Sequence, residues 1–190
     1  MLSFGASAEI NQALQKQLLT MAELDQSIRK ELGEAGWDKA PKELLDKVSA
    51  IDEKNTSKLK SMLSNRAWFS KAEVGIDGIG AAFLIIQHSP DNELKERMLP
   101  VLKQAYLNGD GVSGQEVALL TDRVLISKGQ QQRYGTQADI RDGKVIFKPI
   151  DDPTTVDERR AEMKMPPLEF YRKLLEEMYG ITDHPEIDLN

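Results

Sequence analysis

The sequence contains no cysteine and only two histidines among its 190 residues. Without cysteine there are no disulfides, thiolate zinc sites, iron–sulfur clusters or cysteine nucleophiles. A metal centre built from several imidazoles is nearly excluded as well, because His184 lies in a polar terminal stretch and only His88 lies in a patterned segment. We therefore expect no cofactor and no metal, with a mixed carboxylate–histidine site as the one metal arrangement left open. Any imidazole chemistry falls to His88.

The chain also lacks an excess of positive charge and a long apolar run. Its 25 basic and 31 acidic residues give a net charge of −6, which argues against nucleic acid as a partner. The longest apolar run, residues 79–86, is far shorter than the roughly 20 residues of a membrane span. The first six residues lack the basic start and apolar core of a signal peptide. We expect a soluble cytoplasmic protein with neither a nucleic-acid nor a membrane partner.

The length suits one domain, since domains typically contain roughly 100–200 residues. We predict a single helical domain over residues 1–180 and a frayed tail over 181–190. Apolar residues recur at three- and four-residue intervals, as they do along one face of a helix. In the first helix, over residues 8–33, this stripe comprises Ile10, Leu14, Leu18, Met21, Leu24 and Ile28. Further helices are expected over 41–63, 76–88, 89–106 and 113–129, with two more beginning near Thr155 and Pro166.

One stretch, near residues 131–150, has the pattern of a β-hairpin. Asp142-Gly143 is a dipeptide typical of a two-residue type I′ turn, which pairs Arg141 with Lys144. The same register pairs Ile140 with Val145 and Ala138 with Phe147, and it places one set of polar side chains on a common face, Arg133, Gln137, Asp139, Arg141, Lys144 and Lys148. That face is either solvated or lines a site. The predicted fold class is mainly α, a bundle of about six to seven helices with one small antiparallel β-hairpin.

Gln87 and His88 are the first candidate functional residues, because they are polar residues at the end of an otherwise apolar helix. An imidazole at this position could exchange protons with a substrate as a general acid or base. The alternative is structural, with His88 capping the last carbonyl groups of its helix.

Asp122 and Arg123 interrupt an otherwise apolar helical segment. A carboxylate and a guanidinium at the edge of a core must be paired, or each costs several kcal/mol. Arg123 could clamp a substrate carboxylate, or both residues could form structural ion pairs with other helices.

The segment from Gln130 to Gln137 is dense in amides and hydroxyls, which supply directed hydrogen bonds without net charge. Gln132, Tyr134, Thr136 and Gln137 could hold a polar small molecule or a peptide, or they could form a buried network. Gly135 indicates a close approach to the backbone by a ligand or a crossing helix.

Asp25 and Arg29 share a helix face at i, i+4 spacing and are a further pair of candidate binding residues. The signal is weak, since such pairs are common on solvated helices, and Asp52 and Asn55 are similar.

Several of these motifs together resemble an uncharacterised bacterial family, domain of unknown function 6624. They are Asp25-Gln26-x-x-Arg29, Gln87-His88, Leu120-Thr121-Asp122-Arg123, Gln132-Arg133-Tyr134-Gly135-Thr136-Gln137 and Val156-Asp157-Glu158-Arg159-Arg160. The resemblance runs from about Leu18 to Tyr171, and it implies no established activity. Where family members are expected to have Gly-Trp-Pro, this chain has Ala67-Trp68-Phe69.

Two functions of different classes follow from the sequence. In one, His88 is the general acid/base of a small enzyme, with Asp122 or Asp25 fixing its tautomer and Tyr134, Thr136 and Gln137 orienting a polar substrate. In the other, the chain is a non-catalytic binding or protein-interaction module built around a polar network. The enzyme hypothesis predicts that five residues converge on one site, His88, Asp122, Arg123, Tyr134 and Gln137.

Overall fold

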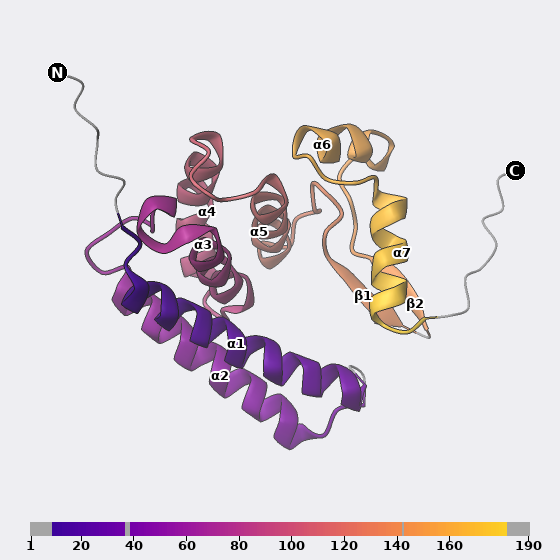
Figure 1. Cartoon of the computed structure of the whole chain (residues 1–190). Helices are drawn as coiled ribbons and strands as arrows, with labels where there is room; N and C mark the ends of the chain where they lie inside the picture. Colours follow the sequence, from indigo (N-terminus) through magenta and orange to yellow (C-terminus); the bar gives the residue numbers. More distant parts are fainter. Residues whose placement is uncertain (1–8, 37–38, 142, 182–190) are drawn as a thin grey trace, which may run out of the picture. The chain divides into compact units, whose positions relative to one another are not determined.

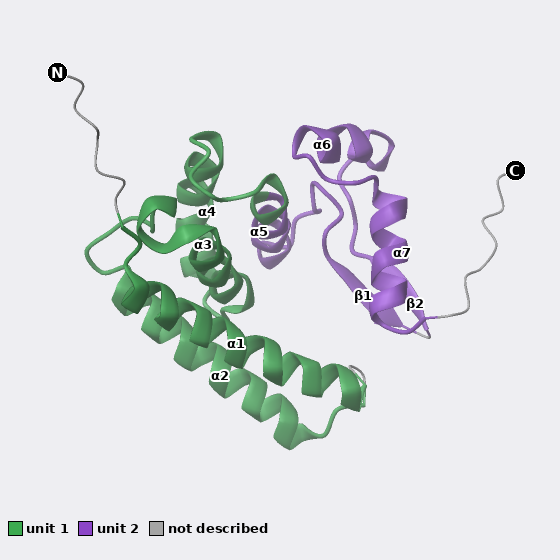
Figure 2. Cartoon of the chain, viewed as in Figure 1, with its two compact units in different colours: residues 1–117 green, residues 118–190 purple. Residues whose placement is uncertain are grey.

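The computed structural model describes residues 9–36, 39–141 and 143–181. Within these residues it has seven α-helices, a short 3₁₀ helix and one two-stranded antiparallel sheet (Figure 1), which confirms the predicted mainly α fold with a hairpin. No helix in the described ranges is long and apolar enough to cross a membrane. The chain divides into two compact units, residues 1–117 and 118–190 (Figure 2), and each is described by itself. A single domain over 1–180 stays a prediction, and the tail predicted over 181–190 lies, apart from Ile181, outside the described residues.

Unit 1 is helical. It contains α1 (Gln12–Ala35), α2 (Lys42–Met62), α3 (Lys71–His88), α4 (Asn92–Leu107) and the first residues of α5 (Gly114–Ser127). Helix α1 packs against both α2 and α3, and α3 also packs against α4 (Figure 1). Helix α4 begins after an Asp91 cap, whose Oδ1 accepts a hydrogen bond from the Leu94 amide, rather than at Ser89. The core of unit 1 includes five fully buried aliphatic side chains, Leu18, Leu59, Ile79, Ile86 and Leu102.

The buried face of α1 shares Leu18, Met21 and Ile28 with the predicted stripe, and it includes a charged residue. The buried positions are Leu18, Met21, Asp25, Ile28 and Leu32, at regular three- and four-residue spacing. The prediction that Ile10 and Leu24 face the core is wrong, because their side chains are 43% and 49% exposed. Ile10 precedes the helix, which begins at Gln12. Asp25 occupies the central position of the stripe instead and is only 1% exposed.

Unit 2 holds the rest of α5 and the hairpin. Its strands are β1 (Ala138–Arg141) and β2 (Lys144–Phe147), followed by the 3₁₀ helix η1 (Pro153–Thr155), α6 (Val156–Glu162) and α7 (Leu168–Met178). The pairs Ala138–Phe147, Ile140–Val145 and Arg141–Lys144 confirm the predicted register. The ladder is shorter than the predicted 131–150, since Gln132 makes only an isolated bridge to Ile150. In the predicted turn, Asp142 lies outside the described residues, and Gly143 has a φ of 70°.

Helix α7 covers one face of the hairpin, as an isolated two-stranded ribbon requires. The rings of Phe147 on β2 and Tyr171 on α7 stack with centroids 6.3 Å apart. The close approach predicted at Gly135 is made by two side chains of unit 2. A Cβ at this position would lie 2.7 Å from Leu168 Cδ1 and 3.0 Å from Ile150 Cδ1.

We expect Gly135→Ala to destabilise the protein by about 2–3 kcal/mol, because it combines a left-handed backbone with overpacking. Gly135 has a φ of 66°, and Leu168 and Ile150 fill the space beside it. Gly143→Ala is the matched control, since it has a φ of 70° but no heavy atom within 4 Å of the added Cβ. This control should lower the unfolding free energy only through its left-handed backbone conformation, by about 1 kcal/mol. Urea unfolding of both variants measures the difference, and equal losses would show that packing at Gly135 contributes nothing.

Candidate functional site

The imidazole of His88 makes a hydrogen bond to the buried carboxylate of Asp25. His88 is the last residue of α3, and its Nδ1 lies 2.9 Å from both Oδ1 and Oδ2 of Asp25 on α1. The His88 side chain is 18% exposed, whereas Asp25 is 1% exposed. The sequence predicts either Asp25 or Asp122 as the carboxylate partner of His88, and Asp25 makes this contact. A carboxylate that accepts from Nδ1–H leaves Nε2 as the proton acceptor of the neutral ring.

Asp25 accepts two further hydrogen bonds from its own helix. Arg29 Nη1 lies 2.8 Å from Oδ1, and Gln26 Nε2 lies 2.9 Å from Oδ2. Burial by itself would raise the pKa of Asp25. The hydrogen bond and charge of His88, with smaller contributions from Gln26 and Arg29, outweigh burial and hold that pKa below its ordinary value. The carboxylate is therefore ionised at neutral pH although it lies within an apolar stripe.

A second carboxylate, Asp52 on α2, completes the cluster. Arg29 Nη2 donates to both of its oxygens, Oδ1 at 3.0 Å and Oδ2 at 2.9 Å. The sequence indicates Asp52 only weakly, and it is not among the predicted site residues. It lies on the α2 face that also carries the buried Asn55 and Leu59, and this 3–4 spacing is the signal that could have identified it. Asn55 Nδ2 joins the same helix interface by donating to the Met21 carbonyl at 3.1 Å.

Gln87 precedes His88 and is 5% exposed. Its Oε1 is buried and accepts no hydrogen bond from the described part of the chain. As for a metal site, the described residues contain no group of three or more His, Cys, Asp or Glu side chains that could hold an ion.

In unit 2 the buried carboxylate of Asp122 binds the backbone of the amide-rich segment. Its Oδ1 accepts from the Arg133 amide at 2.7 Å and the Tyr134 amide at 3.0 Å. Its Oδ2 accepts from both the amide and the hydroxyl of Thr136, each at 2.9 Å. Asp122 is fully buried, and its oxygens are occupied by donors of this segment. The carboxylate thus fixes the path of residues 133–136 against α5.

Gln132 closes the base of the hairpin in a similar way. Its Nε2 donates to the carbonyls of Gln137 and Lys148, at 2.9 and 2.7 Å, and its Oε1 accepts from the Gln137 amide at 2.9 Å. Arg160 on α6 is fully buried and donates to the Tyr134 carbonyl at 2.7 Å. These hydrogen bonds form a continuous polar network within unit 2.

The remaining predicted site residues of unit 2 are Gln137, Tyr134 and Arg123. Gln137 Nε2 donates to Thr136 Oγ1 at 3.0 Å, whereas its Oε1 and the phenol of Tyr134 make no hydrogen bond within the described ranges. Arg123 lies half-buried on α5, close enough to Tyr179 for its charge to matter. Burial raises the pKa of Tyr179, and the positive charge of Arg123 opposes that rise.

The structure therefore brings the predicted site residues together in two groups. In unit 1, His88 is joined to Asp25 and Arg29. In unit 2, Asp122 is joined to the segment that carries Gln132, Tyr134, Thr136 and Gln137. Convergence of both groups on one site stays a prediction.

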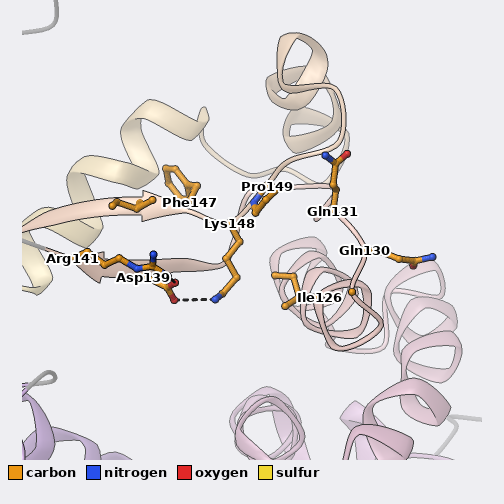
Figure 3. Close-up of a pocket in the computed structure, with 10 residues that line it drawn as sticks. Ile126, Gln130, Gln131, Asp139, Arg141, Phe147, Lys148 and Pro149 are labelled. Atoms are coloured by element: carbon orange, nitrogen blue, oxygen red, sulfur yellow. Dashed lines mark hydrogen bonds and ion pairs between the residues drawn. The ribbon is translucent and has the colours of Figure 1, made fainter.

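Unit 2 also contains a hollow on the polar face of the hairpin, with a volume of about 430 Å³ (Figure 3). Asp139 lies in its wall between two cations, with Lys148 Nζ at 3.0 Å and Arg141 Nη2 at 2.8 Å from its oxygens. The hydrogen bond from Lys148, opposed by partial burial and reinforced by Arg141, lowers the pKa of Asp139. The other lining residues are Ile126, Gly129, Gln130, Gln131, Ile146, Phe147 and Pro149.

Fold and site define a mainly α protein with a buried aspartate–histidine pair and a second buried aspartate that binds the backbone just before the hairpin. The chain matches the family of unknown function DUF6624 over residues 12–184 and belongs to this family. Searches of curated proteins and of solved structures found no match.

The lowered pKa of Asp25 predicts how the stability of unit 1 depends on pH. A carboxyl group whose pKa is lower in the folded state stabilises the fold fully above its unfolded value, roughly 3.9. That contribution is lost as the pH falls through the folded pKa. We expect the unfolding free energy of the wild type to fall between about pH 5 and pH 2, and that of Asp25→Asn to fall less steeply. Urea unfolding across this range measures both slopes. Equal slopes would show that Asp25 has the same pKa in both states.

Proposed function

We propose that this chain is a small cytoplasmic enzyme of bacterial origin in which His88 acts as a general acid and base. The observation that carries the proposal is the Asp25–His88 hydrogen bond at 2.9 Å. An ionised carboxylate on Nδ1 orients the ring, selects the tautomer and stabilises the imidazolium that forms when Nε2 takes a proton. Nε2 makes no hydrogen bond within the described part of the chain, and the side chain is partly exposed. This leaves it able to meet a substrate.

The substrate class that fits the remaining groups is a polar small molecule or a peptide. Tyr134 Oη and Gln137 Oε1 retain hydrogen-bonding capacity, whereas the Thr136 hydroxyl is engaged by Asp122 and Gln137. Hydrolysis, elimination and group transfer all need a positioned acid or base and are compatible with this arrangement. We propose that the reaction belongs to one of these three classes, and the predicted role of Tyr134 and Gln137 in orienting the substrate stays a prediction.

We expect His88→Gln to lower turnover by about 10²–10⁴-fold, the usual contribution of a general acid or base. A panel of chromogenic esters, phosphodiesters and amides, together with a metabolite-binding screen, would identify a substrate for the measurement. Glutamine keeps a donor for Asp25, so the melting temperature should change little. His184→Gln, the other histidine of the chain, is the matched control and should retain full activity. Unchanged turnover in His88→Gln would overturn the proposal.

A second candidate function, a non-catalytic binding module, is favoured by the hollow on the hairpin face. Its polar wall presents two cations, Arg141 and Lys148, and one anion, Asp139, and the amides of Gln130 and Gln131 lie at its rim. Its volume is within the range of small-molecule sites, about 300–1,000 Å³. The excess of cations in a chain of net charge −6 favours a carboxylate-bearing ligand.

For this binding function we expect N-acetylglutamate to bind more tightly than N-acetylglutamine or N-acetyllysine. The amide NMR signals of Gly129 to Gln131 report binding at the hollow. Lys148→Gln should weaken binding about fivefold, and Asp139→Asn should strengthen it, because it removes the repelling carboxylate. Lys103→Gln, an exposed position on α4, is the control and should leave affinity unchanged. Equal affinity for the three probes would exclude a carboxylate site here.

A further inference from the structure

Four charged or titratable side chains of unit 1 form a connected series of contacts across three helices. Asp52 on α2 is paired with Arg29 on α1, Arg29 with Asp25 on the same helix, and Asp25 with His88 on α3. Arg29 contacts the two carboxylates through different nitrogens, Nη2 for Asp52 and Nη1 for Asp25. One guanidinium can therefore serve both at the same time. All four side chains are less than a fifth exposed.

The charges along this series of side chains alternate in sign, and they do not cancel while the imidazole is neutral. Two carboxylates and one guanidinium leave one unbalanced negative charge. A proton on His88 balances it. Without Asp52, Arg29 would already neutralise Asp25, and a protonated imidazole would add an uncompensated positive charge. Without Arg29, two carboxylates would be left to attract the imidazolium. Because the cluster is partly buried, water and salt screen these charge interactions only weakly.

We propose that Asp52 is a positioning residue, which acts through Arg29 to leave the charge of Asp25 available to the imidazolium of His88. This inference rests on the proposed acid–base role of His88 and deepens it. Arg29 and Asp25 stand between Asp52 and the imidazole, and the contact of Asp52 with Arg29 Nη2 determines how much of the guanidinium charge is available to Asp25. It follows that removal of Asp52 and removal of Arg29 act on His88 with opposite signs.

Other charged groups lie on the elements packed against α3. The Asp91 cap of α4 is paired with Lys60 of α2 at 2.6 Å, and Lys95 of α4 has its ammonium 3.3 Å from Asn92 Oδ1. On α1 and α2, the contacts of the described residues join Asp25, Arg29 and Asp52 to the imidazole. The Asp91, Lys60 and Lys95 side chains are the same in every variant below, so their effect on His88 cancels in the comparison.

The test is the pH titration of the His88 ring, followed by NMR in the full-length protein. The chain has only two histidines, and His184→Gln assigns the signals, so the His184 resonance is an internal reference in the other spectra. We expect Asp52→Asn to move the His88 midpoint to lower pH by about half a unit, and Arg29→Gln to move it upward by a similar amount. Arg29→Lys, which keeps the charge, should give a smaller shift than Arg29→Gln.

Opposite shifts separate a charge effect from a structural one. If these residues only held α1 and α2 together, both substitutions would loosen the Asp25 contact and move His88 in the same direction. Shifts of one sign, or no shift in Asp52→Asn, would overturn the inference. The titration needs no substrate, so its outcome is independent of the activity assay. The expected shifts can be absent while His88→Gln still lowers turnover, and they can be present in a protein without catalytic activity. Far-UV circular dichroism of each variant verifies that the helices are retained.

Discussion

The burial of a single carboxylate, Asp25, is the constraint on which the organisation of unit 1 depends. An ionised group within the apolar stripe of a helix is tolerated only when charged or hydrogen-bonding partners surround it. Those partners come from two helices, Gln26 and Arg29 on α1 itself and His88 at the end of α3, while Arg29 is in turn held by Asp52 on α2. The need to satisfy one buried charge thereby fixes the register of three helices and places an imidazole at their junction.

Unit 2 applies the same principle with different donors. Asp122 is also a buried aspartate, but its oxygens accept from backbone amides and one hydroxyl rather than from titratable groups. Such a site fixes the path of a loop and contains no imidazole. The pair in unit 1 differs because one of its donors is an imidazole, whose second nitrogen is not used within the described residues. This chemical difference is the reason that the acid–base proposal rests on Asp25 and His88 rather than on Asp122.

Sequence patterns predicted the elements well where the signal is local. The hairpin register followed from one dipeptide, because a two-residue turn leaves a single way to pair the flanking residues. The α1 stripe shows where local patterns fail. Leu24 and Asp25 are adjacent, and both fit a helical repeat, so hydrophobicity favoured Leu24 although the structure buries Asp25. Its partner His88 lies 63 residues away, and the Asp52 that pairs with Arg29 lies 23 residues from Arg29. Periodicity within one helix cannot report contacts at such separations.

By itself, the sequence determined the mainly α class and the hairpin with its register, and it limited the predicted imidazole chemistry to His88. These follow from composition and from interactions between near neighbours in the chain. Only the tertiary structure decided that Asp25 is the carboxylate that meets His88, that Arg29 links it to Asp52, and that Asp122 binds the loop backbone. The physical reason is that a buried charge is compatible with the fold only if distant segments supply its partners, and three-dimensional packing selects those segments.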